Sequence, residues 1–324
     1  MTSAPPWIFR ALQLGAAAAI ALAAAVLMDL PNPFWAAMPV WVVAQPFRQD
    51  LVLRAVLRVA GTALGAAIGW WILTAIPSPA MQVAMLALTS GLGAALAYRI
   101  GTIYSYGVLL AAITVAVIVV PALDHAVDAL AMAKGRLACT VIGVIAVTAI
   151  TFLFTPARPD RPEPIPHPAL ERVARHGVIA AATALLGGAL LHLIGGPAGK
   201  GAALSLSVFS LLIASSRNPA PMLAYMPTGA AIGVIAALAY RGMDAALPDP
   251  AGMALLLAFP FIAAGAILRS HPRTAPFGLD ANMCFLLAAE AGTAGHGLTA
   301  HALGGIAMIA AAIVFTAAFR RLAG

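Results

Sequence analysis

The sequence predicts an all-α membrane protein with about twelve transmembrane helices, arranged as two parallel repeats of six helices. Its 324 residues are 62% hydrophobic and only 9% charged, whereas soluble proteins average roughly 45–50% apolar and about 25% charged residues. A soluble core cannot bury that much apolar surface, so lipid is the expected solvent. The second observation is repetition, because the pentapeptide Gly-Ala-Ala-Ile-Gly occurs at residues 65–69 and again at 229–233.

Apolar segments of spanning length follow one another along the chain. In the first half we expect spans at residues 8–28, 34–46, 54–76, 80–98, 103–121 and 137–154. In the second half we expect them at residues 172–194, 200–214, 219–240, 251–268, 277–292 and 299–319. The membrane repeats are then 1–157 and 172–324. Between them, 158–171 forms a stiff, extended cytoplasmic linker, because its many prolines forbid a helix.

Positive charge predicts how these spans are oriented. With a cytoplasmic N-terminus, only four of the 18 Lys and Arg residues face outside, namely Lys134, Arg136, Lys200 and Arg241. This distribution satisfies the positive-inside rule and predicts that both termini are cytoplasmic. The polar stretch 123–135 is expected to form a short external helix that does not span the membrane.

Two spans are expected to be irregular. The second span, 34–46, carries Pro39 and ends in the pair Gln45-Pro46, and the eighth span, 200–214, is short and follows a Gly/Pro-rich stretch. Interrupted segments at matching positions of two repeats point to a transport site. The backbone groups that they free must face protein or a water-filled cavity, because lipid offers no hydrogen-bond partner.

Glycines at a spacing of four residues form a groove along the third predicted span. Gly61, Gly65 and Gly69 lie on one helix face, and Gly229 and Gly233 repeat the pattern in the second half. Such a groove lets another helix approach closely. We interpret it as a packing feature and expect this helix at the interface of the two halves. The groove packs either within one chain or between two, so a homo-oligomer is one open outcome.

Two carboxylates fall well inside predicted spans, Asp280 and Glu290, both in the eleventh. A carboxyl group in lipid is costly and usually faces a cavity or a partner, so each is a candidate for the transport pathway. Because burial favours the protonated form, either group is able to couple substrate movement to protons. The alternatives are that Asp280 pairs with Arg269 or Arg273, and that Glu290 lies near the external surface.

Arginines gather at the expected cytoplasmic mouth of both repeats, namely Arg54, Arg58, Arg99, Arg217, Arg269 and Arg273. They are either ordinary topogenic charges or a basic funnel that concentrates anions. Trp35 and Trp41 lie on the irregular second span. They are either membrane-belt residues or contacts for an aromatic ligand.

Several classes of function are disfavoured. The sequence has no Gly-x-x-x-x-Gly-Lys-Ser/Thr loop, no Gly-x-Ser-x-Gly elbow and no paired metal motif, so we expect no enzyme, no metal and no cofactor. The cations lie between apolar runs, which topology explains better than nucleic-acid binding does.

The second and third spans carry a family resemblance. The aromatic-rich stretch Phe34–Pro46, followed by Arg58-x-x-Gly61-Thr62-x-x-Gly65, resembles the fusaric acid resistance (FUSC) and aromatic acid exporter superfamily. The resemblance implies efflux of aromatic carboxylic acids or related toxic anions across a bacterial inner membrane, often with a periplasmic adaptor of the membrane-fusion type. Long family members carry a large cytoplasmic region where this sequence has only the proline-rich linker.

The sequence therefore favours an inner-membrane exporter of organic anions, driven by the proton gradient. We expect Gln45, Pro46, Arg58 and Asp280 near the pathway, with membrane lipid and a small organic anion as partners. A passive channel or pore subunit is the first alternative. The second is a non-transporting membrane scaffold for a periplasmic adaptor protein.

Overall fold

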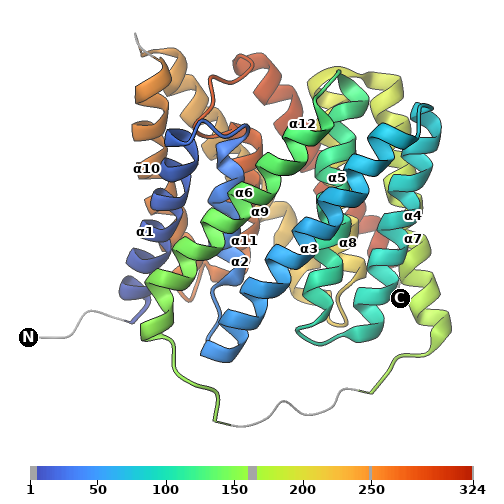
Figure 1. The fold of residues 1–324 in the computed structure, drawn as a ribbon, viewed down its shortest axis with the longest axis horizontal. Coiled ribbons are helices and arrows are strands. Elements are labelled where there is room, and N and C mark those ends of the chain that lie inside the picture. The colour runs from blue at the N-terminus through green and yellow to red at the C-terminus, as the bar shows by residue number, and fades with distance from the viewer. Residues whose placement is uncertain (1–5, 160–165, 248–249, 323–324) are drawn as a thin grey trace, which may run out of the picture. The chain divides into compact units, whose positions relative to one another are not determined.

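Helices make up all the regular structure of the described chain. A computed structural model describes residues 6–159, 166–247 and 250–322 and shows no strand in these ranges (Figure 1). Ten described helices are long and apolar enough to cross a membrane, and two shorter apolar helices cover Pro33–Val43 and Ala275–Ala289. The all-α membrane class is therefore confirmed, with ten full-length candidate spans where the sequence predicted about twelve.

The described chain divides into two compact units, and each unit takes helices from both halves of the sequence. The first unit holds the described residues of Met1–Ala55, Ala138–Arg158 and Tyr225–Ala302. The second unit holds those of Val56–Leu137, Pro159–Ala224 and Leu303–Gly324. The two compact units therefore do not coincide with the two sequence repeats.

In the first unit, α1 (Pro6–Leu27) packs along α10 (Pro250–Ser270), and α10 packs on α11 (Ala275–Ala289). The 3₁₀ turn η1 (Pro33–Ala36) and the short helix α2 (Met38–Val43) lie against both α1 and α11. The second apolar segment is therefore interrupted, as its prolines predicted, because the turn and α2 are separate short elements.

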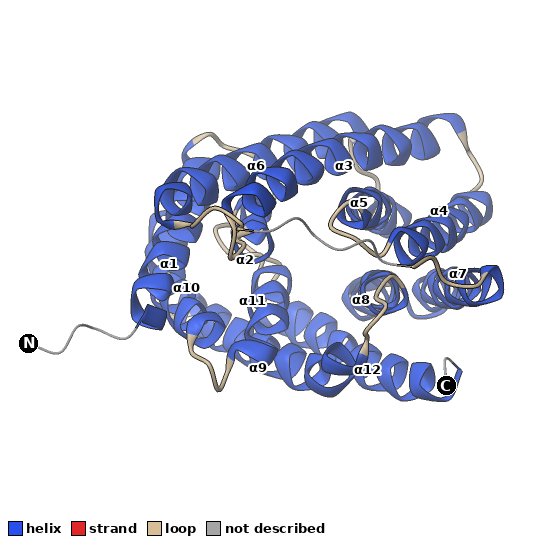
Figure 2. Cartoon of the chain, turned by 90° about the horizontal axis from the view of Figure 1, so that it is seen from below, coloured by secondary structure: helices blue, strands red, loops and turns tan. Residues whose placement is uncertain are grey.

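In the second unit, α4 (Pro79–Ile100), α5 (Ser105–Asp124), α7 (Leu170–Ile194) and α8 (Gly196–Ala214) pack together (Figure 2). Aliphatic side chains fill the space among them, and Leu86 of α4 is fully buried there. Each unit thus combines the first two helices of one half of the sequence with the fourth and fifth helices of the other half.

Four further helices have residues in both units. They are α3 (Arg48–Ala75), α6 (Ala129–Thr151), α9 (Ala220–Ala245) and α12 (Leu298–Leu322). These are the third and sixth helices of each half. Each is a candidate membrane span by its length and hydropathy.

The glycine face of α3 packs on α5. A Cβ added at Gly61 would collide with the carbonyl oxygen of Gly107, and one added at Gly65 would collide with that of Ala111. Only glycine allows the two backbones to approach this closely. The glycine face of α3 therefore packs within the first half of the sequence, because α5 belongs to the same half as α3.

The second half repeats this packing between α9 and α11. A Cβ added at Gly229 would lie 2.8 Å from the carbonyl oxygen of Phe277 in the first turn of α11, and Gly233 contacts the next turn. Gly61 and Gly65 face the first two turns of α5 in the same way. By packing, Gly229 corresponds to Gly61, so the identical pentapeptides are shifted by one helical turn. A spacing of four residues permits this shift because each step of four returns to the same face.

Replacing Gly65 with Ala is expected to lower the free energy of unfolding by roughly 1–3 kcal/mol, because the added methyl group meets backbone that cannot rotate away. Thermal unfolding of the purified protein in detergent measures the effect. Gly242→Ala in α9 is the matched control, since no described atom lies within 4 Å of its added Cβ. That control should be neutral or stabilising by up to about 1 kcal/mol. A Gly65→Ala protein as stable as the wild type would contradict the packing.

The predicted break in the eighth span is wrong. α8 is a regular helix of 19 residues. Gly195, with φ of 65°, separates it from α7, and Pro197 lies in its first turn, where the missing N–H costs nothing. Among the described residues, the other short apolar helix is α11.

The predicted external helix at 123–135 is also wrong. α5 continues to Asp124, and α6 begins at Ala129. The carboxylate of Asp128 accepts hydrogen bonds from the N–H groups of Leu130 and Ala131, which caps α6 and explains why the helix starts there. Lys134 therefore lies inside a candidate span.

Candidate functional site

The break after α2 places two polar side chains beside freed carbonyl groups. Pro46 has no N–H and cannot continue a helix. Gln45 Nε2 donates to the carbonyl oxygens of Val42 (3.2 Å) and Ala44 (3.0 Å). Arg54 Nη1 donates to the Val42 oxygen at 3.1 Å. Gln45 and Arg54 therefore cap the C-terminal end of α2, where the helix dipole also favours a cation.

Three arginines and one carboxylate gather within the first unit. Arg269, in the last turn of α10, interacts electrostatically with Asp280 of α11 and with Arg54 of α3. Arg10 of α1 interacts with Arg269 as well. We name these four residues the arginine–aspartate cluster. With all of its groups ionised, the cluster carries an excess of two positive charges.

Asp280 has no direct partner within the described part of the chain. Neither a hydrogen bond nor an ion pair within 4 Å joins its carboxylate to Arg269 or Arg273 there. The side chain is half-buried. Helix α9 covers its base, since a Cβ added at Gly229 would lie 2.7 Å from the Cβ of Asp280. The described structure thus holds Asp280 near Arg269 without the simple ion pair that the sequence left open.

The crossing of α10 and α11 holds the cluster in place. Asn282, only 3% exposed, donates from Nδ2 to the carbonyl oxygens of Gly265 (2.9 Å) and Gly278 (2.7 Å). A Cβ added at Gly278 would lie 2.7 Å from the Cα of Arg269, so the two helices touch there through backbone. This contact fixes Arg269 relative to Asp280, two residues beyond Gly278.

Glu290 does not lie inside a span, so that prediction is wrong. α11 ends at Ala289, and Glu290 is the residue after it, in the left-handed conformation with φ of 48°. Its Oε2 lies 3.2 Å from Nε2 of His296, whose side chain is 65% exposed. The apolar run continues up to Glu290, so the predicted span extended past the actual end of α11.

The end of α9 holds a buried ion pair that the sequence did not predict. Arg241 Nη1 lies 2.8 Å from Oδ2 of Asp244, and the two side chains are 4% and 7% exposed. The same guanidinium donates to the carbonyl oxygens of Ala289 (2.6 Å), Glu290 (2.9 Å) and Thr293 (3.0 Å). Arg241 therefore joins α9 to the C-terminal end of α11. The predicted end of the ninth span at 240 placed both partners outside the membrane.

Arg58 is buried in the second unit. It is 3% exposed, and its Nη1 donates to the hydroxyl of Tyr106 at 2.7 Å. Its Nε has no hydrogen-bond partner in the described chain. A charge that only orients a span in the membrane needs no such burial, so the Arg58 side chain is part of the protein interior. When Gly229 is aligned with Gly61, the residue that corresponds to Arg58 is Met226, and Met226 is also buried.

The remaining arginines of the predicted mouth have surface or capping positions. Arg99 is exposed in the last turn of α4. Arg217 donates to the carbonyl oxygens of Tyr98 and Arg99 and thereby caps α4. Arg273 is exposed. None of these three belongs to the arginine–aspartate cluster.

The tryptophans separate into two groups. Trp35 and Trp41 are 4% and 1% exposed, so the membrane-belt interpretation is wrong for them. The Nε1 of Trp41 is buried without a hydrogen-bond partner among the described residues. Trp70 and Trp71 are 41% and 49% exposed near the end of α3, as belt residues are.

Comparison with protein families gives two matches along the chain. The model of the fusaric acid resistance protein family, FUSC, matches residues 7–163 and again residues 161–323. The first match contains α1–α6 and the second α7–α12, so the predicted tandem repeat is confirmed. No curated protein and no solved structure matches the chain.

Proposed function

The chain belongs to the fusaric acid resistance protein family, as its motifs predicted, and from that membership we propose that it exports small organic anions. Aromatic carboxylic acids are the substrates that we favour, and the inner (plasma) membrane of a bacterium is the location. The family membership supports a membrane transporter, and the finer assignment depends on the charges inside the first unit.

The arginine–aspartate cluster is the observation that supports this proposal most directly. Charged groups within membrane segments are costly and mark substrate or ion pathways. The excess of positive charge attracts an anion, and a guanidinium binds a carboxylate through two parallel hydrogen bonds. In the described chain no hydrogen bond engages the guanidinium of Arg269, so its donors are available to a substrate.

We assign complementary roles to Arg269 and Asp280. Arg269 receives the carboxylate of the substrate, while Arg10 and Arg54 raise the local positive potential. The ionised carboxylate of Asp280 competes with the substrate for Arg269 and so promotes release. A bound anion and an ionised Asp280 repel each other, so the anion and a proton on Asp280 favour each other's binding.

This linkage decides which part of the proton-motive force drives export. Because the anion and the proton are favoured together, an inward pH gradient acting through Asp280 opposes export. The membrane potential favours export, since each negative charge that leaves a negative-inside cell gains about 2.3 kcal/mol per 100 mV. We therefore propose that the electrical component of the proton-motive force drives export, and that Asp280 controls release of the substrate.

Further parts of the proposal come from the charge pattern and from the family. Both termini face the cytoplasm, and a periplasmic adaptor of the membrane-fusion type receives the substrate. A homo-oligomer is a compatible assembly. We propose that the repeats 1–157 and 172–324 are the two domains and that 158–171 links them; residues 160–165 of the linker lie outside the described residues.

Flux through proteoliposomes tests the proposal. Vesicles loaded with radiolabelled fusaric acid at pH 8 should release it at least about ten-fold faster than protein-free vesicles when the interior is made negative. A pH gradient without a potential should give little acceleration. Unlabelled substrate on one side should drive labelled substrate against its gradient, which a carrier does and a passive channel does not. Absence of counterflow would favour the channel, and absence of any flux would favour the scaffold.

A further inference from the structure

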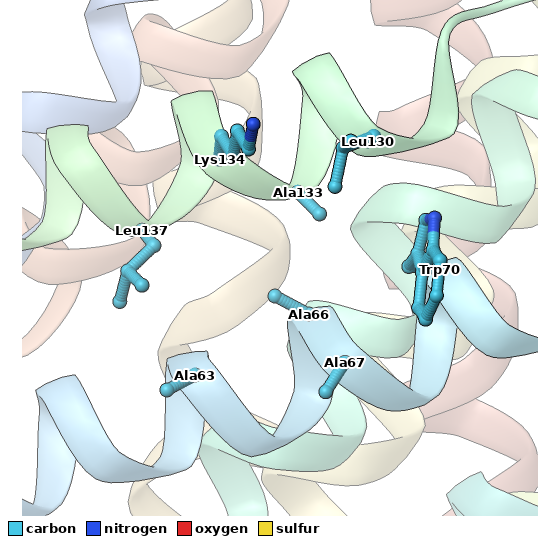
Figure 3. A pocket seen from close by; sticks show the side chains of 8 residues that line it. All are labelled: Ala63, Ala66, Ala67, Trp70, Leu130, Ala133, Lys134 and Leu137. Atoms are coloured by element: carbon cyan, nitrogen blue, oxygen red, sulfur yellow. The ribbon is translucent and has the colours of Figure 1, made fainter.

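A groove on the second unit lies between α3 and α6 and contains no member of the arginine–aspartate cluster. Its volume is about 180 Å³ (Figure 3). Four alanines line it, Ala63, Ala66 and Ala67 of α3 and Ala133 of α6, together with Leu130 and Leu137 of α6. Trp70 and Lys134 bring the polar atoms of its lining side chains, one from each helix, and no carboxylate lines it. The groove is thus mainly apolar, with one cation at its edge.

The groove exists because alanines stand where larger residues would fill it. Ala66 and Ala133 are 5% and 7% exposed and pack together with the buried Ile118 of α5. Ala67, beside them, is exposed along the groove. From Ala63 to Trp70 the groove follows α3 for about 10 Å, at 1.5 Å per residue. This shape suits an extended hydrocarbon chain better than a compact solute.

Lys134 and Trp70 each lie near an end of their helix, and Figure 3 shows Leu130, one turn before Lys134 on α6, on the side of the groove where Trp70 lies. Lys134 is five residues after the start of α6 at Ala129, and Trp70 is five residues before the end of α3 at Ala75. Each is therefore about 7.5 Å inside its helix end, the depth at which lysine and tryptophan side chains reach lipid headgroups. Lys134 is exposed and forms no hydrogen bond or ion pair within the described ranges.

We propose that this groove is a binding site for one anionic glycerophospholipid. An acyl chain lies along the alanines, the ammonium group of Lys134 pairs with the phosphate, and the indole N–H of Trp70 donates to the headgroup region. Charge complementarity selects the ligand, because the rim offers a cation and no carboxylate. One lysine near a membrane surface favours an anionic lipid by about five-fold.

Native mass spectrometry of the delipidated protein in detergent tests the site, with phosphatidylglycerol and phosphatidylethanolamine as probes. The wild type should bind phosphatidylglycerol about five-fold more tightly than phosphatidylethanolamine. Lys134→Gln should remove that preference. Ala67→Leu should weaken the binding of both lipids, because the larger side chain occupies the groove and the position is exposed enough to tolerate it.

Two variants serve as matched controls. Lys200→Gln removes the other lysine of the chain, and Ala60→Leu enlarges an exposed alanine on α3 that lies outside the groove. Both should bind as the wild type does. Equal affinity of the wild type for the two lipids would overturn the proposal, as would an unchanged preference in Lys134→Gln or wild-type binding by Ala67→Leu. These readouts are independent of transport.

Discussion

Replacing Arg269 with Gln is expected to weaken the binding of an aromatic carboxylate by about 30-fold or more, because it removes the partner of a desolvated charge. Replacing Asp280 with Asn should have the opposite sign. Like charges in a partly buried site repel each other, so removing the carboxylate should tighten binding by about ten-fold or more. Export by Asp280→Asn should nevertheless fall to a tenth or less, since release loses its competing anion.

Equilibrium binding of radiolabelled fusaric acid in detergent and initial efflux rates from proteoliposomes separate these two effects. Arg273→Gln is the matched control, because Arg273 is exposed in the same α10–α11 connection and should change neither quantity by more than about two-fold. If both Arg269→Gln and Asp280→Asn weakened binding to a similar extent, the two residues would be structural and the assigned roles would fail.

Replacing Arg241 with Met is expected to destabilise the protein by about 3–5 kcal/mol, the cost of leaving a buried charge without its partner. Asp244 would then stay buried and uncompensated, and the carbonyl groups at the end of α11 would lose their donor. Thermal unfolding monitored by tryptophan fluorescence measures the loss. Arg241→Met combined with Asp244→Leu should recover much of it, because an apolar pair of similar volume replaces the ion pair.

The contact between His296 and Glu290 in the neighbouring loop provides the comparison. His296→Gln removes the contact to Glu290 and should shift stability by less than about 1 kcal/mol, as surface pairs do. Equal destabilisation by His296→Gln and Arg241→Met would show that the loop as a whole, and not the buried guanidinium, holds the end of α11.

Apolar runs and proline positions predicted most helices because each signal acts within one segment. The run before Ile100 and the proline-broken stretch around Pro39 are examples. Helix ends were less predictable where a distant residue decides them. α11 ends at Ala289, where Arg241 binds the terminal carbonyl groups, and Arg241 lies 48 residues away in sequence. Gly292 and Gly295 indicate that a helix ends nearby, but the end at Ala289 itself coincides with the contacts of the distant Arg241.

The sequence by itself determined that this chain is helical, membrane-embedded and repeated, because composition and periodicity set the solvent and the helix faces. It also supplied the glycine spacing that lets α3 and α9 pack closely. Only the tertiary structure decided which helices meet: Gly61 faces α5 and not the other half, and Arg10, Arg54, Arg269 and Asp280 come together from four helices. The physical reason is that charge proximity across helices depends on packing, which one-dimensional periodicity does not specify.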